Sequence, residues 1–173
     1  MPGGGVTVAS ILDGKKILAV DDEPDVLEVL EEEILSSCSG CEFDKATSYH
    51  AAIGKLESNA YDMVILDIMG VRGFDLLDMA VKRNFKVVVL TAHALIPEAL
   101  KQCFERKARA YLPKEKLGEI VPFLEDVFQY GYRAGWKRLL EKLKDPFEAR
   151  FTPGWEAKIG LNWQEGETGE DNP

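Results

Sequence analysis

The sequence predicts an α/β protein built on a doubly wound, five-stranded parallel sheet, followed by a long C-terminal helix and tail. Short apolar runs alternate with segments in which apolar residues recur at helical spacing. This alternation repeats five times, and parallel strands need crossover connections, which place helices on both faces of the sheet. The length of 173 residues suits one domain of ordinary size with an appendage.

Each strand is predicted from a short apolar run, and each helix from the periodic segment that follows. Lys16-Ile-Leu-Ala-Val20 is typical of a buried strand, and Pro24 suits the first turn of the next helix. Residues 42–47 predict an edge strand, and Ser48 is a candidate cap for the second helix. The remaining strands are predicted at 62–67, 85–91 and 108–112, and the remaining helices at 74–81, at 97–107 and from 117 onward.

The last predicted helix continues well past the fifth strand. Its apolar stripe extends from Ile120 to Leu143 and includes Trp136. Gly131 and Gly135 predict a kink or a break, and Pro146 predicts the end of the helix. Two interpretations stay open, and both can hold together: the stripe packs back on the rest of the chain, or it forms a dimerisation or docking surface.

The chain is therefore divided into an N-terminal segment (1–14), a principal domain (15–128), and a helical extension with an acidic tail (129–173). That extension is too short for an independent DNA-binding output domain. The net charge of −9 also argues against nucleic-acid binding, which needs clustered Lys and Arg. Acidic residues concentrate in 21–33 and again in 146–173.

Nothing in the sequence indicates a membrane or secretion signal. No apolar run approaches the ~20 residues of a spanning helix, and the N-terminus lacks the features of a signal peptide. The odd number of cysteines (Cys38, Cys41 and Cys103) favours reduced thiols in the cytoplasm. Cys38 and Cys41 form a C-x-x-C motif, and an ordinary loop with two thiols is favoured over a redox or metal site.

Charged and hydroxyl side chains follow four of the predicted strands, at the edge where sheets of this class bind ligands. Asp21 and Asp22 follow the first strand, Asp67 ends the third, Thr91 ends the fourth, and Lys114 follows the fifth. Clustered carboxylates repel one another unless a cation compensates, and Mg²⁺ prefers such oxygen ligands. A Lys and a hydroxyl can hold phosphoryl oxygens, while an Asp can accept phosphorus as an acyl phosphate.

Four motifs, in order and spacing, resemble the receiver domain of two-component response regulators over residues 15–128. They are Val20-Asp21-Asp22-Glu23-Pro24, Val64-Ile-Leu-Asp67-Ile-Met69, Leu90-Thr91-Ala92 and Tyr111-Leu-Pro-Lys114. The resemblance implies a flavodoxin-like, CheY-like fold. It also implies that Asp67 is the phosphoacceptor and that Asp21, Asp22, Asp67 and the Met69 carbonyl hold Mg²⁺. Thr91 and Lys114 then contact the phosphoryl oxygens, and Tyr111 is the aromatic switch residue that follows the state of Thr91.

The function that the resemblance implies is a phosphoacceptor receiver protein of a phosphorelay. It acts in the cytoplasm, with a sensor histidine kinase or phosphotransfer protein and a downstream protein target as partners, and without nucleic acid or membrane. It is not an enzyme beyond phosphorylation and dephosphorylation of its own aspartate, and a homodimer through the last helix is left open. The alternative is a degenerate receiver that acts as a phosphorylation-independent interaction or dimerisation module. A haloacid-dehalogenase-like phosphatase is disfavoured, because its acidic pair would come last in the chain rather than first.

Three departures from the family pattern affect the loops around the site. Residues 68–73, after Asp67, contain no Pro. The segment from Asp67 to Thr91 is short, which predicts a trimmed third helix or a tight loop before the fourth strand. Lys114 is followed by Glu115 where the family usually has Pro, so a cis bond at that position is not expected. His93, near the site mouth, is expected to be an exposed loop imidazole.

Overall fold

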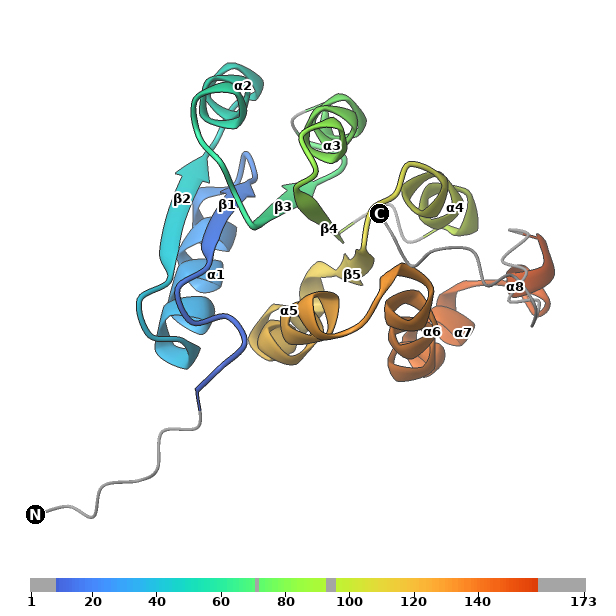
Figure 1. Cartoon of the computed structure of the whole chain (residues 1–173). Helices are drawn as coiled ribbons and strands as arrows, with labels where there is room; N and C mark the ends of the chain where they lie inside the picture. Colours follow the sequence, from blue (N-terminus) through green and yellow to red (C-terminus); the bar gives the residue numbers. More distant parts are fainter. Residues whose placement is uncertain (1–8, 71, 93–95, 159–173) are drawn as a thin grey trace, which may run out of the picture.

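The computed structural model describes residues 9–70, 72–92 and 96–158 of the chain. Its five strands form one parallel sheet in the order β2-β1-β3-β4-β5 (Figure 1). The strands are β1 (Lys16–Val20), β2 (Glu42–Ala46), β3 (Met63–Asp67), β4 (Lys86–Thr91) and β5 (Ala110–Pro113). The predicted doubly wound sheet is confirmed, and β2 lies at its edge as predicted.

Helices cover both faces of the sheet, which explains why the inner strands are apolar between their end residues. In Figure 1, α1 (Pro24–Ser37) and α5 (Ile120–Gln129) lie on one face of the sheet. On the other face lie α2 (Tyr49–Ser58), α3 (Gly73–Lys82) and α4 (Pro97–Glu105). Every residue of β3 is buried, whereas the edge strand β2 is mostly exposed or half-buried.

Local signals set the ends of these helices. Pro24 is the first residue of α1, and the Ser48 side chain accepts a hydrogen bond of 3.2 Å from a backbone N–H in the first turn of α2. The fourth helix ends at Glu105, two residues earlier than predicted. Lys107 adopts φ 71°, a left-handed conformation that cannot continue an α-helix.

The short segment between Asp67 and Thr91 ends in a tight loop. Only residues 83–85 connect α3 to β4, and Asn84 in their middle adopts φ 61°. Asn tolerates this left-handed conformation better than most residues, so the chain reverses within three positions. The described residues contain no cis peptide bond, and Lys114 opens a short 3₁₀ helix, η1 (Lys114–Glu119), in place of the proline turn of the family pattern.

The predicted long C-terminal helix is present as a series of helices. After α5 come α6 (Tyr132–Lys142), α7 (Lys144–Arg150) and α8 (Trp155–Lys158). The break predicted at Gly131 is confirmed, while Gly135 lies inside α6. The end predicted at Pro146 is wrong. Pro146 lies in the first turn of α7, where its missing N–H has no helical partner to lose.

The extension packs back onto the rest of the chain through aromatic side chains. The indole N–H of Trp136 donates to the Ala108 carbonyl at 2.8 Å, and the Tyr132 hydroxyl donates to the Phe104 carbonyl. The Phe104 ring lies 5.3 Å from the ring of Tyr132 and 5.4 Å from that of Trp136. Because this stripe is buried within the chain, its packing back on the rest of the chain is confirmed, while dimerisation or docking stays a prediction.

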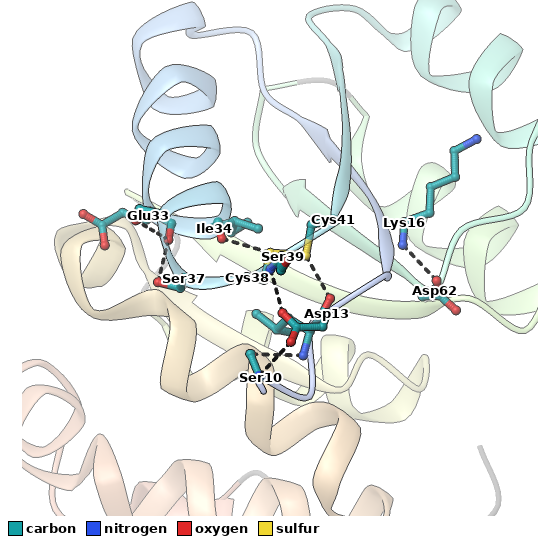
Figure 2. The surroundings of a disulfide bond; sticks show 12 residues. Ser10, Asp13, Lys16, Glu33, Ile34, Ser37, Cys38, Ser39, Cys41 and Asp62 are labelled. Atoms are coloured by element: carbon teal, nitrogen blue, oxygen red, sulfur yellow. Dashed lines mark hydrogen bonds between the residues drawn. A yellow bond between two sulfur atoms is a disulfide. The ribbon is translucent and has the colours of Figure 1, made fainter. Parts of the chain in front are cut away.

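The C-x-x-C loop is the clearest correction to the sequence analysis. Cys38 and Cys41 form a disulfide, so the expectation of two free thiols is wrong in this structure (Figure 2). Ser39, between them, donates its backbone N–H to Asp13 Oδ1 at 2.6 Å. The loop between α1 and β2 folds back on itself at Gly40, which adopts φ 70°, and this turn brings the two sulfur atoms together. Cys103 is free and buried.

Some predictions fall outside the residues that the structure describes. These include the exposed imidazole of His93 and the acidic part of the tail, residues 159–173. Among the described helices, none combines the length and the apolar character needed to cross a bilayer.

Candidate functional site

The C-terminal ends of four neighbouring strands bring the predicted site residues together. Asp21 follows β1, Asp67 ends β3, Thr91 ends β4, and Lys114 follows β5. Asp21, Asp67 and Thr91 are buried, with exposed fractions of 1 %, 6 % and 0 %. Buried carboxylates need compensating charge or hydrogen bonds, so their surroundings define the site.

Lys114 supplies the positive charge between the buried carboxylates. Its Nζ lies 2.8 Å from Oδ2 of Asp21 and 3.1 Å from Oδ2 of Asp67. The exposed carboxylate of Glu23 is further away, at 3.9 Å. The Lys114 side chain is itself only 10 % exposed, so little water screens these ion pairs. One ammonium group therefore contacts two buried carboxylates, so these three groups together carry a net negative charge.

Backbone N–H groups orient both carboxylates toward Lys114. The N–H of Glu23 donates to Asp21 Oδ1 at 2.9 Å, and the N–H of Met69 donates to Asp67 Oδ1 at 3.1 Å. In each case the other oxygen, Oδ2, faces the ammonium. Met69 thus lies at the site, and the residue is 64 % exposed. The role of its carbonyl as a metal ligand stays a prediction.

Gly70 is a site residue that the sequence analysis missed. A Cβ atom at this position would lie 2.5 Å from Oδ1 of Asp22 and 2.9 Å from Oδ2 of Asp67. No side chain fits there without displacing one of the carboxylates. A glycine three residues after a strand-ending Asp was the available signal, but in sequence it looks like an ordinary loop residue.

The three aspartates form a donor set that fits a hard divalent cation. Oxygen atoms of Asp21, Asp22 and Asp67 all lie within 4.8 Å of one another, with Asp22 on the exposed side. Burial raises the pKa of the Asp21 carboxyl above its ordinary value of 3.8, against the opposing effects of Lys114 and the Glu23 N–H. Oxygen ligands and excess negative charge are what Mg²⁺ binds in proteins.

A cavity of about 210 Å³ opens over the phosphoacceptor candidate. Its described lining consists of Asp22, Glu23, Asp67, Met69, Gly70, Ala92 and Lys114. Of these, Glu23 and Ala92 were quoted in the sequence motifs but not assigned to the site. Although Asp67 is only 6 % exposed, it therefore borders open space at the strand ends.

Thr91 and Tyr111 are placed differently from the acids. Thr91 is fully buried at the end of β4 and lines a second cavity beside Lys114. Tyr111 is fully buried in β5, and its ring centroid lies 6.4 Å from that of Phe147 in α7. The proposed coupling between Thr91 and the rotamer of Tyr111 stays a prediction. The aromatic neighbour of Tyr111, Phe147, belongs to the C-terminal extension.

Comparison with known proteins agrees with this geometry. Residues 17–124 match the family model of the response regulator receiver domain. The structure resembles the response regulator TrrA of Thermotoga maritima, solved in complex with Mg²⁺ and BeF, with 31 % identity and a TM-score of 0.56, covering 65 % of this chain and 98 % of that one. It also resembles the non-phosphorylated HemR receiver domain of Leptospira biflexa, with 31 % identity and a TM-score of 0.58, covering 67 % and 95 % of the two chains.

A more distant likeness extends to the chemotaxis response regulator CheY4 of Vibrio cholerae, with 22 % identity, a TM-score of 0.54, and coverage of 65 % of this chain and 98 % of that one. No curated protein matches the chain. The family match covers more than half of the sequence and includes all four predicted motifs. The five-stranded parallel sheet and the acidic site at the strand ends agree with this match. The chain therefore belongs to the response regulator receiver domain family of two-component systems.

Proposed function

We propose that this protein accepts a phosphoryl group on Asp67, with Mg²⁺, and passes the signal on through protein contacts. The observation that supports this most is the position of Asp67. Its buried carboxylate faces a 210 Å³ cavity, has Lys114 Nζ at 3.1 Å, and lies within 4.8 Å of the oxygens of Asp21 and Asp22. A nucleophile, a cation and metal ligands are thus present at one accessible point.

In the proposed reaction, an Asp67 oxygen forms a bond to phosphorus while the bond from phosphorus to the donor's leaving group breaks. The leaving group departs with the electron pair, and the product is an aspartyl phosphate. When bound, Mg²⁺ supplies charge neutralisation for the transferring phosphoryl group. Asp21 and Asp22 would hold it together with Asp67, Lys114 would donate to a phosphoryl oxygen, and the Thr91 hydroxyl would approach from β4.

Partners follow from this chemistry. The proposed donors are a sensor histidine kinase or a phosphotransfer protein, and the proposed output is a downstream protein target in the cytoplasm. No turnover is proposed beyond phosphorylation and dephosphorylation of Asp67. A homodimer through the last helix stays a prediction, and it would have to use surface other than the Trp136 side chain, which is buried within the chain.

The test is labelling by acetyl phosphate with Mg²⁺, followed by intact-mass spectrometry. The wild-type chain is expected to gain one phosphoryl group, and Asp67→Asn to gain none, because the amide cannot attack phosphorus. Asp62→Asn is the matched control. Asp62 is exposed and directly precedes β3, at the end opposite Asp67, where it accepts a hydrogen bond of 2.9 Å from the Lys16 N–H.

Two results would reject the proposal. One is unchanged labelling of Asp67→Asn. The other is a wild-type chain that neither labels nor shifts its amide NMR spectrum with beryllofluoride and Mg²⁺, and this second result would favour a degenerate receiver that acts without phosphotransfer.

A further inference from the structure

Arg150, the last residue of α7, reaches the phosphoacceptor site from outside the segment that matches the receiver family. Its Nη2 lies 2.6 Å from Oε1 of Glu115, which follows Lys114 directly in the chain. The two side chains are 43 % and 50 % exposed, so the pair lies at the molecular surface beside the buried Lys114. The C-terminal extension thus contributes a cation to the rim of the site.

The pair lies against a cavity that neighbours the one over Asp67. A cavity of about 180 Å³ is lined by Thr91, Ala92, Lys114, Glu115 and Arg150. It shares Ala92 and Lys114 with the 210 Å³ cavity over Asp67. Because Lys114 lines both cavities, a compound that contacts its ammonium at Asp67 lies next to the cavity that Arg150 lines.

The position of Arg150 is fixed by packing of its helix. Phe147 and Phe151 are both buried, and their rings stack with centroids 5.2 Å apart. The Phe147 ring also lies 5.7 Å from that of Trp155 and 6.4 Å from that of Tyr111 in β5. This packing fixes the backbone at Arg150, and the ion pair with Glu115 orients the flexible side chain that carries the guanidinium.

The charges around the cavities favour an additional anion-binding group at this point. The described residues at the site include the carboxylates of Asp21, Asp22, Glu23, Asp67 and Glu115, against one ammonium, that of Lys114. A phosphodonor brings a phosphate anion into this negative surrounding. Arg suits that task because its planar guanidinium has five donors, so it can hold a carboxylate on one edge and phosphate oxygens on another.

We propose that Arg150 and Lys114 form a subsite that binds the phosphate of a small phosphodonor before transfer to Asp67, with Glu115 positioning the guanidinium. This inference rests on the proposed function of Asp67. The subsite holds the phosphate group of the donor and takes no part in the bond changes. Phosphorus still passes from the donor's leaving group to the Asp67 oxygen, and the leaving group keeps the electron pair.

The experiment measures the rate of Asp67 labelling against the concentration of acetyl phosphate, and separately of phosphoramidate, with saturating Mg²⁺. Arg150→Ala is expected to raise the half-saturating concentration of both donors about tenfold, the effect of losing a charge-assisted hydrogen bond. The maximal rate is expected to stay within about twofold, because the lost contact exists before the transition state as well as in it. Arg150→Lys is expected to fall between the two, since it keeps the charge but loses the planar fork.

The matched control is Lys144→Ala, which removes an exposed cation at the other end of the same helix. Lys144 pairs with Glu148 at 3.8 Å and does not line either site cavity. It is expected to behave as wild type. Circular dichroism and unfolding curves show whether each variant keeps its fold, and Arg150→Lys retains the test if Arg150→Ala does not.

Several outcomes would overturn the subsite. Arg150→Ala with unchanged half-saturating concentrations would do so, as would an equal effect of Lys144→Ala. A double variant, Arg150→Ala with Glu115→Gln, that returns to wild-type behaviour would show that Arg150 only neutralises Glu115. Failure of the wild-type chain to label on Asp67 would instead reject the proposed function, so the two failures are distinguishable.

Discussion

Lys114 is the residue on which the charge of the site depends. It is the described cation that contacts both Asp21 and Asp67, and all three groups are largely removed from water. Leaving a buried carboxylate without its partner is far more costly than losing an exposed ion pair. The stability of the protein without metal should therefore depend on this one side chain.

We expect Lys114→Met to lower the free energy of unfolding by about 3 kcal/mol without divalent cations. Added Mg²⁺ is expected to stabilise this variant more than the wild type, because the metal then supplies the missing positive charge. Urea unfolding with and without Mg²⁺ measures both effects. Lys116→Met is the control in the same 3₁₀ helix, since its exposed pair with Glu119 at 3.3 Å contributes little. Equal losses in the two variants would contradict this account.

Gly70→Ala should damage the metal site while leaving the fold intact. Its methyl group would meet the carboxylates of Asp22 and Asp67, so the affinity for Mg²⁺ with beryllofluoride is expected to fall at least about tenfold. Titration followed by NMR or calorimetry measures that affinity. Gly54→Ala in α2 is the control, because its Cβ meets no atom within 4 Å and should stabilise the helix by roughly 0.5–1 kcal/mol. Unchanged affinity in Gly70→Ala would show that the donor set lies elsewhere.

At the scale of elements, the loop between α1 and β2 lies at the end of the sheet away from the site. Cys41 comes directly before β2, whereas Asp21, Asp67 and Lys114 follow or end their strands. The disulfide joins residues only three positions apart, so it restrains a short stretch of chain. Its effect should be local and should not reach Asp67.

Reduction of the Cys38–Cys41 disulfide is expected to lower the free energy of unfolding by no more than about 2 kcal/mol, because the closed loop is so short. The rate of Asp67 labelling should stay the same. Thermal unfolding and labelling with and without dithiothreitol test both statements, and the Cys38→Ala, Cys41→Ala double variant should not respond to the reductant. A change in labelling on reduction would connect this loop to the site after all.

At the scale of the whole molecule, the extension and the sheet share one hydrophobic core. Tyr132, Trp136, Leu143 and Phe147 are buried together with residues of α4 and β5. The extension therefore supports the edge of the sheet at β5 and carries Arg150 to the site. Residues 129–150 belong to the folded unit rather than to a separate appendage.

Trp136→Ala is expected to destabilise the protein by about 4 kcal/mol, since it removes a fully buried indole and the hydrogen bond to Ala108. Unfolding followed by circular dichroism measures this without relying on tryptophan fluorescence. Lys137→Ala, the exposed neighbour on the same helix, should stay within about 0.5 kcal/mol of wild type. A similar small loss in both variants would mean that α6 is not part of the cooperative core.

Much of the site could be predicted because its residues follow buried strands. Asp21, Asp67 and Lys114 are far apart in sequence, but the ends of parallel strands meet at one edge of the sheet. Arg150 carries no such signal. It lies on the short helix α7, past Pro146, where the sequence predicted the helix to have ended, and its distance to Glu115 depends on how α7 packs.

From sequence alone, the order of strands and helices and the acidic site at the strand ends followed, because periodic burial and strand polarity are local properties of the chain. The tertiary structure decided what those local patterns leave open. Cys38 is paired with Cys41, the apolar stripe that includes Trp136 is buried in the core, and Arg150 lies beside Glu115. Each depends on packing between segments distant in sequence or on a loop turn, and residue spacing does not encode such contacts.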